Sequence, residues 1–242
     1  MFIANWKMNG SEAMLKKWLA EIKENLNHDA RSSCILCPPV CFISQASKII
    51  QRDDLGLGLG AQDVDPETNS ALTGGISGSM LKELGSEYVI VGHSERRVNL
   101  NESSSLLKSK LEAATISGLK VIYCIGESLE EKKEGKSFEV LENQLKVFNS
   151  LTNLESVIAY EPVWAIGTGK VAQISYISEM HNFIIEKTKE LNINLISLAY
   201  GGSVNSSSSK EILSLEEVNG LLIGGASLEA KEFSKIVNSI EN

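Results

Sequence analysis

The chain has 242 residues, of which 43% are hydrophobic and 22% are charged, and its formal net charge is -8. This composition is typical of a globular protein with one large buried core, so we expect a single domain over residues 1–242. The acidic balance argues against nucleic acid and against anionic membranes as partners. An anionic ligand would therefore have to be held by local groups.

No apolar run reaches the roughly 18 residues that a membrane-spanning helix requires, and residues 1–5 lack the character of a secretion signal. Four cysteines in a chain of this length do not indicate a disulfide scaffold. Cys34 and Cys37 have the spacing of a zinc or redox pair, but their apolar surroundings are typical of a buried strand. We expect a cytoplasmic protein with structural thiols and no bound metal.

Short apolar runs alternate along the chain with amphipathic helical patterns. The strand-like runs lie near Ile3, Ile35, Leu57, Ile90, Ile122, Ile158, Ile196 and Leu222. Between them, apolar residues recur at helical spacing, as from Leu15 to Ile22. Eight strands separated by helices predict parallel pairing. The simplest architecture is a closed (β/α)8 barrel, and an open doubly wound sheet is the alternative.

In a barrel, chemistry gathers where the strands end and the following loops begin. Glu161 directly follows one apolar run, and burial at the edge of a core raises a carboxyl pKa toward the range of a general base. The loop after it contains Gly167 and Gly169, whose backbone N–H groups can approach an anion. This pattern favours proton abstraction beneath a mobile flap. An ordinary junction between a strand and a loop would have the same sequence pattern.

Two further strand ends carry candidate catalytic side chains. Lys7 follows the first strand, and its cation is suited to a phosphate or to a developing enolate oxygen. His93 follows the fourth strand where a helix begins, and the positive end of a helix favours a neutral imidazole that can still donate a hydrogen bond. Each residue alone also has a structural interpretation. His28 and His181 are interpreted as structural.

Two glycine turns indicate a phosphate site. Gly201 and Gly202 precede Ser203 after the seventh strand, and Gly224 and Gly225 follow the eighth. Turns of this kind present backbone N–H groups to phosphate, and the loops after strands seven and eight hold phosphate in many barrels. The glycines at 56, 58 and 60 lack the spacing of a dinucleotide motif.

Five segments together closely resemble the triosephosphate isomerase family, in the order and spacing of that family. They are NWKMN at 5–9, GHSERR at 92–97, AYEPVWAIGTGK at 159–170, YGGSV at 200–204 and GGAS at 224–227. The resemblance implies a TIM barrel that interconverts D-glyceraldehyde 3-phosphate and dihydroxyacetone phosphate, a step of glycolysis and gluconeogenesis. It implies proton transfer through an enediolate, without a metal or a cofactor.

The resemblance also implies roles for individual residues. Glu161 is the base that takes a proton from carbon, and His93 is the neutral electrophile that moves protons between the substrate oxygens. Other positions of the catalytic pattern are Asn5, Lys7, Glu95 and Cys124. The phosphate is held by Asn5, Lys7, Gly167, Ser203, Gly224 and Gly225. The segment 162–172 forms a lid, and Ile166 and Leu222 press on the base when it shuts.

Loop 62–75 is a long polar break, and the resemblance implies that it enters a neighbouring subunit of a homodimer. The family usually has Gln-Asn near the start of this loop and Thr-Gly-Glu near its end. This chain instead has Asp63 after the glutamine and Gly75 in place of the glutamate. The change removes a possible partner of Arg96, and Asp63 adds a charge near the site.

Two other functions agree with parts of the sequence. Another phosphate-binding barrel isomerase or epimerase would have the glycine turns but would not need Lys7, His93 and Glu161 together. A barrel that bound phosphate without catalysis would be expected to have lost one of these side chains, and none is missing.

Overall fold

Eight parallel strands form a closed barrel in the computed structural model, which describes residues 1–149, 151, 154–166 and 172–240. The strands pair in chain order, and β1 pairs with both β2 and β8, which closes the ring. Their bounds are β1 Phe2–Asn5, β2 Cys34–Cys37, β3 Gly58–Ala61, β4 Tyr88–Val91, β5 Lys120–Ile125, β6 Ser156–Tyr160, β7 Leu195–Tyr200 and β8 Gly220–Ile223. The predicted (β/α)8 TIM barrel is confirmed, and the open sheet is wrong.

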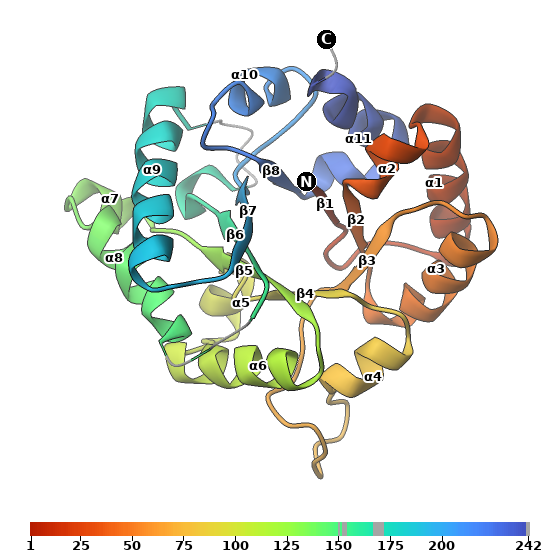
Figure 1. Ribbon diagram of the computed structural model, residues 1–242, viewed down its shortest axis with the longest axis horizontal. Coiled ribbons are helices and arrows are strands. Elements are labelled where there is room, and N and C mark those ends of the chain that lie inside the picture. The colour runs from red at the N-terminus through yellow and green to blue at the C-terminus, as the bar shows by residue number, and fades with distance from the viewer. Residues whose placement is uncertain (150, 152–153, 167–171, 241–242) are drawn as a thin grey trace.

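Helices surround the barrel as an outer ring (Figure 1). The α-helices are α1 Glu12–Asn25, α2 His28–Ser32, α3 Val40–Arg52, α4 Gly78–Glu83, α5 Ser94–Asn99, α6 Ser104–Ile116, α7 Leu129–Lys133, α8 Ser137–Leu145, α9 Ile174–Glu190, α10 Ser209–Leu213 and α11 Ala230–Val237. Short 3-10 helices are η1 Lys146–Phe148, η2 Val163–Ala165, η3 Gly225–Leu228 and η4 Asn238–Ile240. Within the described ranges, no helix is long and apolar enough to cross a membrane.

The strands bury side chains on both of their faces, which explains why they read as continuous apolar runs. One set fills the barrel interior with small and branched side chains: Ile3, Ile35, Cys37, Ile90, Ile122, Cys124, Val157, Ala159, Ala199 and Leu222. The alternate residues face the helices and join a larger core that includes Leu15, Leu19 and Ile22 of α1. The apolar face predicted for α1 is therefore its buried face.

Two strand predictions can be compared directly with the structure. Cys34 and Cys37 bound β2 and are buried free thiols, as the apolar run predicted. The strand predicted around Leu57 instead begins at Gly58. Its glycines obscured the apolar pattern, and at Gly60 a Cβ would lie 2.6 Å from the Cys37 Sγ. This close packing against β2 explains why glycine occupies the strand.

His181 lies on the buried face of α9, as predicted for a structural histidine. Its ring centroid is 5.8 Å from that of Tyr160 and 6.5 Å from that of Tyr200. Its Nδ1 lies 3.3 Å from the Glu217 carbonyl oxygen, while Nε2 is buried with no hydrogen-bond partner in the described part of the chain. Burial lowers the pKa of His181 to about 4.

We expect His181 to make the fold sensitive to acid. Its folded-state pKa lies below its ordinary value of 6.5, so between these pH values the unfolded chain binds the proton more readily. The free energy of unfolding should fall by about 3 kcal/mol as the pH drops from 6.5 to 4, since one pKa unit is worth about 1.4 kcal/mol. Urea unfolding of wild type and His181→Gln at pH 7 and pH 4 measures this. An equal loss in both proteins would contradict the assignment to His181.

Candidate active site

A cavity of about 340 Å³ opens at the carboxyl ends of the strands. Five strand ends or the loops that follow them supply its predicted residues: Asn5, Lys7, His93, Glu161, Ser203, Gly224 and Gly225. Glu95 borders an adjoining cavity of about 140 Å³ that shares Asn5, Lys7 and His93. Gly167, together with residues 168–171 of the predicted flap, lies outside the described residues. The barrel thus brings together side chains that are far apart in the sequence.

Glu161 is a buried carboxylate at the end of β6, with 2% of its surface exposed. Its Oε1 lies 3.0 Å from the His93 Nε2, and its Oε2 accepts a hydrogen bond of 3.0 Å from the Ser94 backbone N–H. Burial raises the pKa of Glu161, but His93, the Ser94 N–H and Lys7 together lower it below its ordinary value. The prediction of a raised pKa was therefore wrong, because it considered burial without these partners.

His93 caps α5, and its hydrogen bonds indicate which ring nitrogen carries the proton. Nδ1 accepts a hydrogen bond of 3.3 Å from the Glu95 backbone N–H, so it is unprotonated in this arrangement. The proton then lies on Nε2, which donates to Glu161. Burial lowers the pKa of His93, but the Glu161 carboxylate outweighs this and raises it. The same nitrogen could donate to a substrate oxygen in place of Glu161.

Lys7 is held in an unusual backbone conformation beside these two residues. Its φ is +52°, which is uncommon for a residue with a side chain and marks a constrained position. Its backbone N–H donates to the Asn5 Oδ1 at 3.0 Å, and its ammonium donates to the Glu95 Oε1 at 2.5 Å. Gln62 donates to the Lys7 carbonyl at 2.8 Å and to the Cys37 carbonyl at 2.9 Å. These contacts fix the cation at the cavity wall.

Glycines on both sides of Glu161 make room for it. A Cβ at Gly126 would lie 1.7 Å from the Glu161 carbonyl oxygen, and a Cβ at Gly201 would lie 2.8 Å from its Cγ. The sequence predicts Gly201 as part of a phosphate turn only, and it gives no signal for Gly126. The Cys124 thiol interacts with the Glu161 carboxylate, and burial, followed by the Glu161 charge, raises the pKa of Cys124 well above its ordinary value. It is therefore a neutral thiol.

The opposite end of the cavity consists mainly of backbone. Gly225 begins η3 and Gly224 directly precedes it. No atom outside the neighbouring residues lies within 4 Å of a Cβ built at Gly225, so its backbone faces open space. The Ser203 hydroxyl donates to the Ala165 carbonyl at 2.6 Å, which ties the loop after β7 to the segment after β6. Backbone N–H groups in such turns suit an anion. Ile166 and Leu222 add apolar surface to the same cavity.

A buried carboxylate that the sequence did not indicate anchors the segment after Glu161. Glu127 accepts hydrogen bonds from the Tyr160 hydroxyl at 3.1 Å, the Trp164 Nε1 at 2.8 Å and the Tyr176 hydroxyl at 2.9 Å. The Lys132 ammonium lies over both the Trp164 and Tyr176 rings, 3.5 and 3.7 Å from their centroids. The sequence carries no signal for this cluster, because its members come from β6, η2, α7, α9 and the loop after β5.

Metal ligands are not grouped in the described ranges: no set of three histidine, cysteine, aspartate or glutamate side chains there is arranged to hold an ion. The chemistry that the cavity offers is that of a carboxylate, an imidazole N–H, an ammonium and backbone amides. A carboxylate in contact with an imidazole N–H is suited to moving protons on a bound molecule. The backbone turns are suited to holding its anionic end.

Comparison with known proteins agrees with this geometry. The family model described as Triosephosphate isomerase matches residues 1–240. The triosephosphate isomerase of Aquifex aeolicus (strain VF5) is 41% identical, over 99% of this chain and 98% of that protein. The enzyme of that name from Escherichia coli O1:K1 / APEC is 37% identical, over 100% and 96%. A crystal structure of triosephosphate isomerase from Bartonella henselae has a TM-score of 0.87 and 37% identity, and the match covers 100% of this chain and 99% of that one. This chain belongs to the triosephosphate isomerase family.

Proposed function

We propose that Glu161 and His93 together move the protons in the reaction of this family, the interconversion of D-glyceraldehyde 3-phosphate and dihydroxyacetone phosphate. The isomerase activity itself follows from membership of the family. The observation that carries the residue assignment is the 3.0 Å contact between the Glu161 Oε1 and the His93 Nε2, inside a cavity whose far end presents glycine turns. We also propose that residues 1–242 act as one domain.

In the proposed reaction, the substrate carbonyl comes between the two residues and takes over their hydrogen bond. Glu161 removes the proton from C2 of the aldehyde, while the His93 Nε2–H donates to the carbonyl oxygen on which negative charge develops. Lys7 adds a positive charge beside the same oxygen atoms, and Glu95 and Asn5 hold Lys7. His93 gives its Nε2 proton to the oxygen on C1 and takes the proton from the hydroxyl on C2. The protonated Glu161 returns a proton to C1, which leaves a hydroxyl on C1 and the ketone at C2. No electron leaves the substrate, so the step needs no redox partner.

The phosphate end of the substrate is assigned to Ser203, Gly224 and Gly225, with Lys7 and Asn5 at the near side. An enediolate can lose its phosphate by elimination if it is released early, so a firm hold on the phosphate protects the product. Gly167 completes the proposed phosphate site by resemblance alone. The apolar side chains of Ile166 and Leu222 line the same cavity, and we assign them to excluding water from the base.

The fate of the transferred hydrogen tests this function. When purified protein converts D-glyceraldehyde 3-phosphate in deuterium oxide, NMR should show dihydroxyacetone phosphate with deuterium on C1. That result is expected because a carboxylic acid exchanges its proton with solvent while the enediolate is bound. Absence of conversion would overturn the proposed function.

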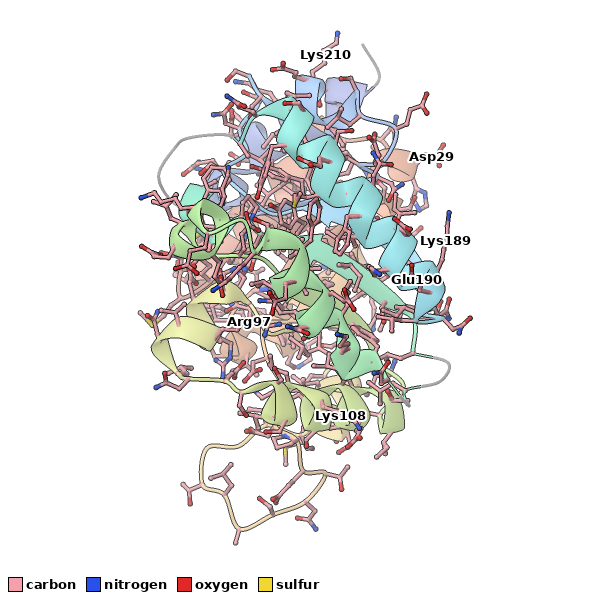
Figure 2. All side chains as sticks on the ribbon, turned by 90° about the vertical axis from the view of Figure 1, so that its left-hand side faces the viewer. Asp29, Arg97, Lys108, Lys189, Glu190 and Lys210 are labelled. Carbon is pink, nitrogen blue, oxygen red and sulfur yellow. The ribbon has the colours of Figure 1, made fainter. Side chains whose placement is uncertain are left out.

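We further infer that two copies of the chain associate through loop 62–75. The loop stands away from the barrel in both views (Figures 1 and 2), and its residues 67–74 are exposed. Large apolar side chains in and near it are exposed as well: Met8, Leu72, Met80, Val98 and Leu100. A cavity of about 420 Å³ beside Met8 and Gln62 offers a place for the loop of a second copy.

We also propose a cytoplasmic location. The free thiols at all four cysteines support this proposal.

Sedimentation measures this association. We expect a species of twice the 26.3 kDa chain mass at micromolar concentration. Leu72→Glu should shift it toward monomer, because a buried unpaired charge opposes association. Leu129→Glu changes an exposed leucine on α7, outside the patch, and should leave the dimer intact. A stable wild-type monomer would contradict the inference.

A further inference from the structure

Four charged side chains form a compact cluster just outside the reaction cavity: Asp63, Arg96, Glu102 and Lys110. The Lys110 ammonium lies 2.7 and 2.9 Å from the two Asp63 carboxylate oxygens and 2.6 Å from the Glu102 Oε1. Arg96 contacts the Asp63 Oδ2 at 2.6 Å and the Glu102 Oε1 at 2.9 Å. The side chains of Lys110 and Glu102 are each only 3% exposed.

The cluster joins segments that the barrel would otherwise leave separate. Asp63 is the second residue of the loop after β3, Arg96 lies in α5, Glu102 lies between α5 and α6, and Lys110 lies in α6. With every member ionised, two positive charges face two negative charges. Asp63 is the member that comes from outside the α5–α6 region, so it links this region to the neighbouring strand.

α5 is the element through which this link reaches the reaction cavity. It is a helix of six residues that begins directly after His93, and its Ser94 N–H donates to Glu161. Arg97 fixes one side of α5 by donating to the Gly92 carbonyl at 2.7 Å and the Cys124 carbonyl at 2.8 Å. Arg96 fixes the other side through Asp63 and Glu102. A shift of α5 would therefore move both His93 and the amide that positions Glu161.

Removing the Asp63 charge would leave the cluster with an excess positive charge against a buried lysine. Breaking one side of a buried ion network is costly because the remaining charge loses its partner without regaining water. Arg96 or Lys110 would then turn toward solvent, and α5 would lose a restraint. The structure also answers the question raised by Gly75: Arg96 is neutralised within its own chain by Asp63, without an acidic side chain at position 75.

We propose that Asp63 is a positioning residue for catalysis: by pairing with Arg96 and Lys110 it holds α5, and thus His93 and the Ser94 N–H, in place against Glu161. The proposal rests on the roles proposed above for His93 and Glu161. It assigns no contact between Asp63 and the substrate.

Asp63→Asn, with a matched control and a charge-restoring double variant, tests the proposal. We expect kcat to fall about threefold to tenfold, since small displacements of catalytic groups cost rate. The inhibition constant of inorganic phosphate should stay within twofold of wild type, because Ser203, Gly224 and Gly225 lie across the cavity. Asp53→Asn changes a partly exposed aspartate that pairs with Arg52 far from the cluster in sequence, and it should leave both constants unchanged. Asp63→Asn/Lys110→Met restores neutrality and should recover most of the lost kcat.

The outcomes separate this proposal from the proposed function. If wild type turns over and Asp63→Asn keeps a kcat within twofold of it, the positioning role is overturned while the function stands. A lower melting temperature with unchanged kcat, or a loss that the double variant does not recover, also overturns the positioning role. If wild type does not turn over, both the positioning role and the proposed function fail.

Should Asp63→Asn not fold, Asp63→Glu provides a second test, because it retains the charge on a longer side chain. Its kcat should be reduced at unchanged phosphate inhibition, and a wild-type kcat would overturn the proposal.

Discussion

Glu161→Gln is expected to lower kcat for triose phosphate isomerisation by about 100-fold or more, the usual contribution of a positioned general base. The amide has almost the shape of the carboxylate and can still accept from the Ser94 N–H, but it cannot take a proton from carbon. Loss of the carboxylate should therefore slow the proton-transfer step and leave the phosphate end of the cavity unchanged.

Steady-state kinetics together with inhibition by inorganic phosphate separate these two effects. We expect a collapse of kcat with a phosphate inhibition constant within twofold of wild type. Near-normal turnover by Glu161→Gln would show that another group is the base. A parallel loss of phosphate inhibition would show that the substitution disturbed the whole cavity.

His93→Ala should lower kcat by about 100- to 1000-fold, which is the cost of removing one donor from a developing oxyanion. Nε2 is the only atom of His93 placed to donate into the cavity, because Nδ1 accepts from the Glu95 backbone N–H. His93→Gln keeps a neutral N–H donor of similar reach, so it should recover part of the loss.

The comparison of kcat for His93→Ala, His93→Gln and wild type measures this contribution. Circular dichroism serves as the control for folding, since His93 also caps α5. If His93→Ala kept more than a third of the wild-type kcat, the electrophile would have to lie elsewhere.

Much of the fold could be predicted because its signals are local. Apolar runs flanked by polar breaks located seven strands directly, and helical spacing identified the buried face of α1 and the structural role of His181. β3 was displaced because Gly58 and Gly60 interrupt its apolar pattern, and the close approach to Cys37 that requires a glycine is visible only in three dimensions.

The site could be predicted only in part, because its electrostatics depend on contacts between distant segments. Strand ends pointed to Lys7, His93 and Glu161, which do meet in one cavity. The direction of the Glu161 pKa could not be obtained from its own segment, since His93 reverses the effect of burial. Gly126 gave no signal because its neighbour is the Glu161 backbone, 35 residues further along the chain.

The role of Asp63 could not be predicted from the sequence either, because its partners lie in distant segments. In the sequence, Asp63 is a departure from the family pattern that adds a charge near the site, while Gly75 removes a possible partner of Arg96. In the structure it is the partner of Arg96 and Lys110. The loop residue and the two cations meet only because β3 and β4 are adjacent in the barrel.

The most direct test of the proposed chemistry is the conversion of D-glyceraldehyde 3-phosphate to dihydroxyacetone phosphate by the purified wild-type chain. Glu161→Gln is measured beside it, without added nucleotide or metal. We predict rapid conversion by wild type and a loss of about 100-fold or more in the variant. A wild-type chain that is folded and binds inorganic phosphate, but does not convert the triose phosphate, would contradict it.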